Sequence, residues 1–155
     1  MKRLMSVLVI VATAAISGAA MAGVSAGAFR AENPQDQSSI FGGSTYIAND
    51  DPAISHAVVA GLGVVGGLSS YGFTVYGTYN GLAGSTCTLY GYMANGNTSP
   101  VYFSTVSIPA GTAGTNFAVP ISLTISNSGI FGLNLHCNLI NKSPSGFTFQ
   151  IRAVN

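Results

Sequence analysis

Short clusters of turn-forming residues recur every 8 to 14 residues over most of this chain, and they limit the length of any element between them. Asn and Gly tolerate left-handed backbone and Pro fixes its own φ, so each cluster favours a turn. The segments between the clusters are rich in Val, Ile, Thr, Tyr and Phe, a composition typical of strands. The clusters occupy residues 49–52, 66–67, 80–81, 95–97, 109–111, 127–129 and 142–146. This spacing predicts an all-β protein built from short strands.

Apolar and polar residues alternate in several of these segments, as they do in a strand with one buried face. From 133 to 139, the Leu and Cys side chains fall on one face, and the Asn and His side chains fall on the other. Residues 121–126 and 147–152 alternate in the same way. After residue 23, no helical period of apolar residues runs long enough to predict a helix. We therefore predict an antiparallel β-sandwich of about seven to eight strands.

The first residues have the layout of a secretory signal peptide. Lys2 and Arg3 precede a mostly apolar stretch over residues 4–16, and small residues follow at Ala20 and Ala22. This order predicts cleavage after Ala22. An uncleaved membrane anchor is the alternative, but the apolar stretch is shorter than the roughly 20 residues that span a bilayer. We expect residues 1–22 to be removed and the rest to be secreted, extracellular or periplasmic, with no membrane span.

The chain that remains after this cleavage suits a single domain. Residues 23–43 are rich in Gly and Ser, and they carry several of the few charges. They predict an irregular N-terminal segment. Residues 44–155 hold the strand pattern and predict the β-sandwich domain.

Two cysteines, Cys87 and Cys137, are present. Export implies an oxidising compartment, so we expect them to form a disulfide. The alternatives are two buried free thiols or a metal site, and a metal site needs more ligands than these residues and a single His supply. Cys87 shares a face with Leu89, just as Cys137 shares one with its leucines. Because both faces are apolar, we predict a bridge in the core that joins the two sheets.

Charge is scarce and unevenly placed. The chain has five Lys+Arg and four Asp+Glu, and charged residues make up 6% of it. No cluster of Lys and Arg is available to offset phosphates, which excludes a nucleic-acid partner. Residues 52–141 contain no charged residue. Soluble β proteins usually protect sheet edges with charge, so this run suggests association with a second copy or with other extracellular proteins.

Three segments resemble the C-terminal half of small secreted proteobacterial β-rich proteins of unassigned function. The sequences are CTLYGY over residues 87–92, GLNLHCNL over residues 132–139, and the closing segment over residues 147–154. The resemblance extends from Ser85 to Asn155. It implies secretion, a β fold and a Cys87–Cys137 bridge, and it implies no activity. Those proteins carry a further cysteine pair in the N-terminal half, where this chain has none.

Few groups are available for catalysis after residue 22. The carboxylates and imidazoles are Glu32, Asp36, Asp50, Asp51, His56 and His136. Carboxylates from one loose segment or one turn can rarely flank a sugar from opposite sides, which argues against a glycosidase. His56 lies near Asp50 and Asp51, but no G-x-S-x-G turn accompanies it, so we expect an ordinary polar residue at a strand start rather than a hydrolase triad. Asn49, Asp50 and Asp51 lack calcium-loop spacing and predict a solvated Asx turn. We predict no enzyme activity, no metal and no cofactor.

Tyrosines are the most suggestive surface residues. Tyr90 and Tyr92 share the strand face opposite Cys87, about 7 Å apart in a strand. An outward face with two tyrosines could stack against sugar rings or another protein. Asn134 and His136, on the polar face of their own strand, are candidate polar contacts for the same ligand. The alternative is that the N-terminal segment covers the face, or that the tyrosines only cap the sheet.

These observations predict a secreted, disulfide-containing, non-catalytic β-sandwich with a nearly uncharged surface. Its expected role is that of an extracellular structural or interaction protein, such as an adhesive, coat or matrix component. The alternative is a carbohydrate-binding module that uses Tyr90, Tyr92, Asn134 and His136.

Overall fold

A computed structural model of the chain describes residues 24–43, 45–63, 68–82, 84–93, 102–125 and 130–155, the last range without the side chains of its first two residues. The predicted signal peptide, residues 1–22, lies outside the described residues. So do the turn clusters at 66–67, 95–97 and 127–129.

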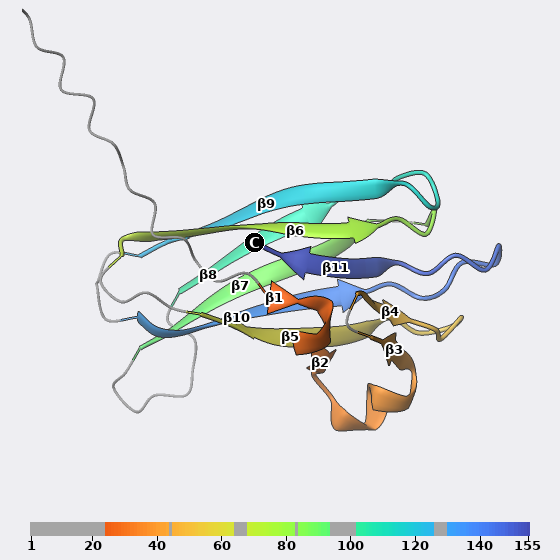
Figure 1. Ribbon diagram of the computed structural model, residues 1–155, viewed down its shortest axis with the longest axis horizontal. Helices are drawn as coiled ribbons and strands as arrows, with labels where there is room; N and C mark the ends of the chain where they lie inside the picture. Colours follow the sequence, from red (N-terminus) through yellow and green to blue (C-terminus); the bar gives the residue numbers. More distant parts are fainter. Residues whose placement is uncertain (1–23, 44, 64–67, 83, 94–101, 126–129) are drawn as a thin grey trace, which may run out of the picture.

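The described strands form two antiparallel sheets that pack face to face (Figure 1). The six-stranded sheet has the order β3–β4–β11–β6–β9, and β1 also pairs with β11. Its strands are β1 (Val24–Ser25), β3 (Ile40–Gly42), β4 (Ile47–Asn49), β6 (Ser70–Thr78), β9 (Asn116–Thr124) and β11 (Gln150–Val154). The five-stranded sheet has the order β2–β5–β10–β7–β8. Its strands are β2 (Arg30–Ala31), β5 (His56–Leu62), β7 (Ser85–Met93), β8 (Tyr102–Ile108) and β10 (Ile130–Leu139). The predicted β-sandwich is confirmed.

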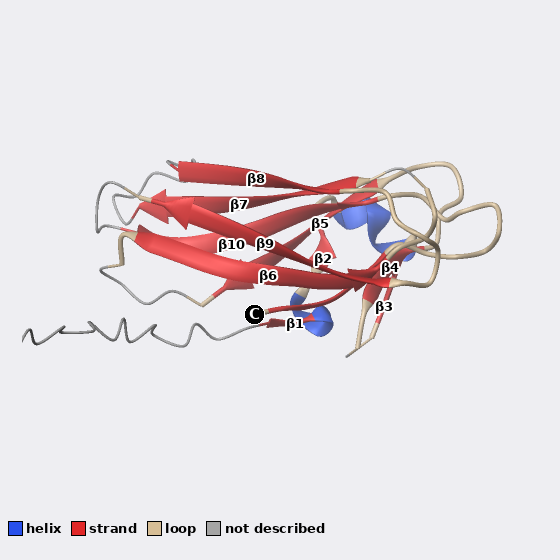
Figure 2. Cartoon of the chain, turned by 90° about the horizontal axis from the view of Figure 1, so that it is seen from above, coloured by secondary structure: helices blue, strands red, loops and turns tan. Residues whose placement is uncertain are grey.

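The described residues contain eleven strands, more than the seven to eight expected. The additional strands are β1 to β4, which have only two or three residues each. A strand this short shows no alternation that sequence could reveal. Three of them lie in the segment expected to be irregular, together with the 3-10 helices η1 (Ala26–Ala28) and η2 (Pro34–Ser38), drawn blue in Figure 2. No helix in the described ranges is long and apolar enough to cross a membrane.

The N-terminal segment is part of the sandwich. Val24 pairs with Val154 on β11, and Arg30 pairs with Val59 on β5. Phe29 and Ile40 are buried in the same hydrophobic core as the long strands. The segment therefore extends both sheets instead of covering one of them.

The core follows the predicted alternation. The buried side chains of three late strands are Phe117, Ile121, Leu123, Leu133, Leu135, Cys137, Leu139, Ile151 and Val154. Phe149 is also buried, whereas Phe147, expected on the same face, is 47% exposed. The reason is a turn before β11, in which the backbone N–H of Ser143 donates to the carbonyl of Phe147. The chain at Phe147 is not yet a strand, so strand alternation does not apply to it.

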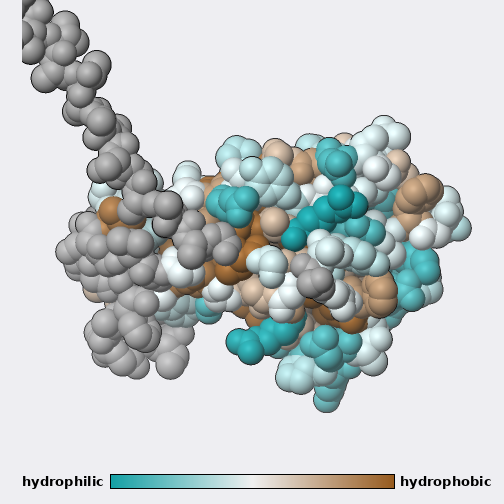
Figure 3. Space-filling model, in the orientation of Figure 1, coloured by the Kyte–Doolittle hydropathy of each residue, from teal (hydrophilic) through white to brown (hydrophobic). Residues whose placement is uncertain are grey.

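The charged residues of the described chain gather on a few elements. They come from the N-terminal segment, the two turns around Asp50 and Lys142, and β11. Lys142 Nζ donates to Asp50 Oδ1 at 2.7 Å and joins the two turns. Strands β6 to β10 carry no charge. In Figure 3 the strongly hydrophilic residues accordingly form separate groups on a surface that is otherwise pale or brown.

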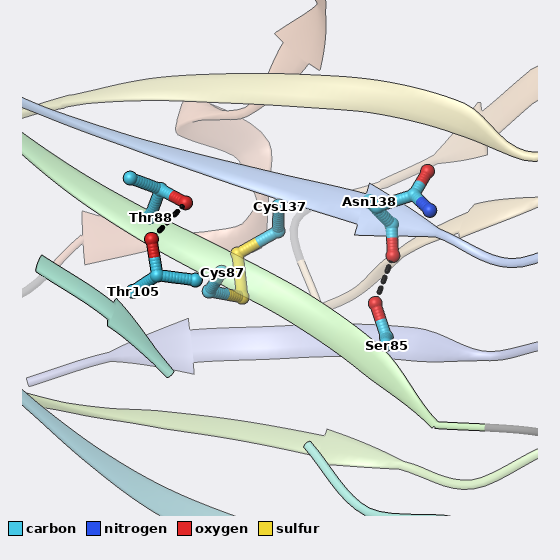
Figure 4. Close-up of a disulfide and its surroundings, with 6 residues drawn as sticks. All are labelled: Ser85, Cys87, Thr88, Thr105, Cys137 and Asn138. Atoms are coloured by element: carbon cyan, nitrogen blue, oxygen red, sulfur yellow. Dashed lines mark hydrogen bonds between the residues drawn. A yellow bond between two sulfur atoms is a disulfide. The ribbon is translucent and has the colours of Figure 1, made fainter. Parts of the chain in front are cut away.

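Cys87 and Cys137 form the predicted disulfide, but its place differs from the prediction (Figure 4). The two residues lie directly opposite each other on β7 and β10, which are neighbours in the five-stranded sheet, with 4.1 Å between their Cα atoms. The expectation of a bridge between the two sheets is therefore wrong. Both sulfurs do point into the core, where Cys87 is 0% and Cys137 2% exposed. Alternation fixes which face a thiol takes, and it says nothing about which strands are neighbours.

Candidate ligand-binding face

The four candidate residues lie on the outer face of the five-stranded sheet. Tyr90 on β7 stands directly opposite Asn134 on β10, and Tyr92 stands opposite Gly132. His136 follows Asn134 on the same face, and all four side chains are half-buried. The two neighbouring strands therefore bring together the residues that sequence placed on two separate strands.

Tyr90 is at the centre of a row of rings. His136 contacts it edge to face, with 4.9 Å between ring centroids. On its other side lies Phe103 of β8, its direct partner across the strands, with 6.5 Å between centroids. Phe103 is 71% exposed, the largest exposure among the big apolar side chains of the described residues. We name Tyr90, Tyr92, Phe103, Asn134 and His136 the aromatic face.

Sequence reasoning missed Phe103. Its strand alternates Phe103, Thr105 and Ser107 with Tyr102, Ser104 and Val106, so both faces contain an aromatic residue and polar ones. Without a clear difference between the faces, the pattern does not say which one is buried.

A carboxylate from the N-terminal segment fixes the His136 ring. Glu32 Oε1 lies 3.3 Å from His136 Nδ1, and the backbone N–H of Glu32 donates to the carbonyl of Ala57 on β5. A carboxylate in this position favours the tautomer with a proton on Nδ1. His136 Nε2 is buried and has no hydrogen-bond partner within the described part of the chain. Sequence reasoning missed Glu32 because the pairing of β2 with β5, which carries it to the sheet, spans only two residues.

Two glycines leave the sheet surface beside Asn134 free of side chains. Gly61 on β5 is its direct partner on one side, and Gly132 precedes it on the same face of β10. A Cβ atom at Gly132 would meet nothing within 4 Å, and one at Gly61 would meet only Asn134 Oδ1, at 3.7 Å. The space above both residues is open, so a ligand can approach the backbone next to the Asn134 amide.

His56 lies apart from this face and is the first residue of β5, at a strand start as predicted, where it is buried. Its Nδ1 lies 3.2 Å from Asp36 Oδ2 and its Nε2 lies 3.4 Å from Asp51 Oδ2, with 7% of its side chain exposed. The backbone N–H of Ala53 donates to Asp51 and, as the largest cause, holds the pKa of that carboxyl below its ordinary value of 3.8. The residues of this cluster bond to one another and to the backbone, so the arrangement ties η2 and the turn before β5 to the sandwich.

The Asn49–Asp51 turn uses its oxygens internally. Asn49 Oδ1 accepts from the backbone N–H of Asp51, and Asp51 Oδ1 accepts from the N–H groups of Ala53 and Ile54. Asn49 is fully buried and its amide donates to the carbonyl of Leu139, so the turn is not the solvated one expected. Among the described residues, no group of three or more His, Cys, Asp or Glu is placed to hold a metal ion.

A shallow hollow of about 410 Å³ lies on the opposite face of the sandwich, over β6 and β9. Gly72, Thr74, Pro120 and Ser122 contribute to its lining, and the rings and aliphatic chains around them are buried. It offers few groups for recognition. The aromatic face combines one exposed ring, Phe103, with half-buried rings, an amide and open backbone, and it is the stronger candidate site.

Comparison of the sequence with family models and with curated proteins finds no match. One similar solved structure is the bacteriophage CBA120 tailspike protein 4 enzymatically active domain, with 6% identity and a TM-score of 0.46. That match covers 69% of this chain and only 14% of the tailspike chain. Another is the CBM22-2 xylan-binding domain from Paenibacillus barcinonensis Xyn10C, with 14% identity and a TM-score of 0.50 over 86% of this chain and 96% of that domain. At this identity, the second similarity shows that the two chains share the β-sandwich fold.

Proposed function

We propose that this protein is a non-catalytic binding domain that takes an uncharged glycan on its aromatic face. The observation that carries the proposal is the row formed by Phe103, Tyr90 and His136, with Asn134 directly opposite Tyr90. Sugar rings present apolar C–H faces that pack on aromatic rings, and hydroxyls at their edges that bond to amides such as that of Asn134. The face provides both kinds of contact.

The charge and shape of the face favour a neutral, extended ligand. At one end of the face, Glu32 lies against His136, and the exposed Arg30 is in register with His136 through Val59, so the two opposite charges leave no net charge to attract an ionic sugar. Phe103, Tyr90, Asn134 and Gly61 follow one another on four adjacent strands. With about 4.8 Å between strands, the row extends roughly 14 Å, enough for several sugar units. The chain shares its fold with a xylan-binding domain, which supports a glycan as the ligand.

Tyr90→Ala tests the proposal, and Tyr76→Ala is its matched control. Tyr76 is a 38% exposed tyrosine on β6, in the other sheet. The measurement is isothermal titration calorimetry against neutral polysaccharides, with a polyuronate for comparison. We expect Tyr90→Ala to raise Kd about tenfold or more, which equals about 1.4 kcal/mol, and Tyr76→Ala to leave it unchanged. The absence of binding to any neutral glycan, or equal losses in both variants, would contradict the proposal.

A specific observation also favours a role in extracellular interaction between proteins. The side of the molecule formed by β7, β8 and β9 carries no charge, although it includes an edge of each sheet. Such edges pair readily with other chains. A glycan would lie over the outer face of the five-stranded sheet, whereas pairing at an edge would use backbone groups, so the two roles overlap at Phe103 on β8.

A further inference from the structure

Besides the two-residue β1, which pairs only with β11, four strands end the two sheets in the described part of the chain: β3 and β9 in one, β2 and β8 in the other. An end strand exposes a row of backbone N–H and C=O groups that can pair with a strand of another chain. Soluble proteins prevent such pairing with short strands, charge, proline or bulges. The four strands differ in how far they are protected.

Three of these edges are protected. β3 has three residues, and β2 has two, one of which is the charged Arg30, with Glu32 directly after it. β9 contains Pro120. The backbone N–H and C=O of its partner, Thr74, bond to Asn155 on the side away from β9, so Thr74 and Pro120 are not a hydrogen-bonded pair. The nitrogen of Pro120 therefore points to the open edge, where it cannot donate.

β8 has none of these protections. Its seven residues pair with β7 in unbroken register, from Gly91 opposite Tyr102 to Ser85 opposite Ile108. It contains no charged residue, no proline and no bulge. Among the described strands it is the one long, regular edge left open.

The disulfide shows which groups of β8 face outward. The Cα atoms of Cys87 and Cys137 are 4.1 Å apart, a distance typical of a pair that exchanges no hydrogen bonds. The backbone groups of Cys87 consequently point to β8, where they meet its partner Val106. Because the direction alternates along a strand, those of Phe103, Thr105 and Ser107 point to the open edge.

We propose that β8 pairs antiparallel with β8 of a second copy, about a twofold axis at Thr105. Thr105 then faces Thr105 of the other copy, and Phe103 faces Ser107 in both directions. These are the three residues whose backbone groups are free to pair, and three such pairs form about six hydrogen bonds. The result is a continuous ten-stranded sheet with both aromatic faces on one side.

The distribution of charge favours a second copy as the partner. The nearest charged strand of the same sheet is β2, four strands from β8, at roughly 19 Å by strand spacing. Two copies can therefore meet at β8 without bringing like charges together. Phe103, which is 71% exposed in a single copy, would contact β8 of the other copy in the dimer.

Sedimentation velocity of the full-length protein over a range of concentrations tests the pairing. As concentration rises, the sedimenting mass of the wild type should shift towards twice the monomer mass. Thr105→Lys should raise the dimer dissociation constant more than tenfold, because it places two ammonium groups on the twofold axis. The control is Thr124→Lys, an exposed threonine on the Pro120-containing strand, which should leave the constant unchanged. Thermal unfolding of each variant verifies that it folds. A protein that stays monomeric at millimolar concentration, or equal effects of the two lysines, overturns the proposal.

Cross-linking tests the register. Thr105→Cys should form a disulfide-linked dimer under mild oxidation, because a hydrogen-bonded pair has Cα atoms about 5.5 Å apart, within the disulfide range. Ser107→Cys alone should not, since its two copies lie roughly 14 Å apart along the strands. A mixture of Phe103→Cys and Ser107→Cys proteins should give the mixed dimer, with peptide mapping to verify that Cys87–Cys137 is intact. Cross-linking of Ser107→Cys with itself, or a dimer without cross-linking at Thr105→Cys, contradicts this register. Neither experiment depends on glycan binding.

Discussion

At the scale of single residues, the imidazole of His56 is a buried polar group between two carboxylates. Both of its nitrogens lie against carboxylates, Asp36 on one side and Asp51 on the other. Removal of a buried ring that contacts both carboxylates takes a polar partner from each of them, which costs more than loss of an exposed ion pair.

We therefore expect His56→Ala to lower the free energy of unfolding by about 2–3 kcal/mol. His136→Ala should lower it by about 1 kcal/mol or less, because its carboxylate partner is half-exposed. Urea denaturation monitored by circular dichroism measures both. Equal losses in the two variants would show that His56 does not hold η2 and the turn together.

Asp51→Asn separates charge from hydrogen bonding in the same cluster. Asparagine keeps the acceptor for the N–H groups of Ala53 and Ile54, and loses the negative charge. The folded-state pKa of Asp51 is lowered from 3.8, so its ionised form stabilises the fold above that pH, and this contribution is lost as pH falls through the folded value. We expect the Tm of the wild type to exceed that of Asp51→Asn at pH 7, and the two to converge towards pH 2. A Tm difference independent of pH would assign the effect to something other than this carboxylate.

At the scale of elements, the pairing of β7 with β10 organises the five-stranded sheet. This pair carries the disulfide, and it places Tyr90 beside Asn134 and His136 beside Thr88. Thr88 in turn bonds through its hydroxyl to Thr105 of β8, at 2.9 Å (Figure 4). On the outer face, the Thr88–Thr105 hydrogen bond thus links β7 to β8, next to the disulfide that links β7 to β10 on the core face.

The double variant Cys87→Ala/Cys137→Ala should lose about 4 kcal/mol of unfolding free energy, the chain-entropy value for a loop of this size. The bridge spans a sequence separation of 50 residues and leaves the unfolded chain with fewer conformations when it is intact. Urea denaturation with and without reductant measures the loss. The double variant should not respond to reductant, and a wild type equally insensitive to reductant would argue against this contribution.

Prediction from sequence succeeded where it depended on residues close in the chain. Alternation from 133 to 139 placed the leucines inward and Asn134 and His136 outward, because successive side chains of a strand point to opposite faces. It failed where the answer depended on strand order. The place of the disulfide within one sheet, Glu32 beside His136 and Phe103 beside Tyr90 all follow from which strands are neighbours, and no local pattern records that.

At the scale of the whole molecule, we propose export with removal of residues 1–22. Intact-mass spectrometry of the protein recovered outside the cytoplasm should give a chain that begins at Gly23, with two hydrogens fewer than the reduced mass because of the disulfide. The layout of the first 22 residues and the disulfide both support this expectation. Recovery of a chain that retains Met1 to Ala22 would contradict it.

The antiparallel pairing of β1 with β11 has a mechanical consequence. Val24 stands opposite Val154, so the two ends of the described chain leave the sandwich at the same point. A pulling force applied at both ends opens neighbouring antiparallel strands one residue pair at a time, which resists less than sliding two strands past each other. Once the outer strands have separated, extension stops at Cys87 and Cys137. The disulfide transmits the force directly between these two residues, so the segment between them is not stretched. In single-molecule stretching, the contour length released should therefore omit that loop until a reductant is added. Under tension, the residues before Cys87 and after Cys137 would extend. The segment between the two cysteines, which includes Tyr90, Phe103 and Asn134, would not.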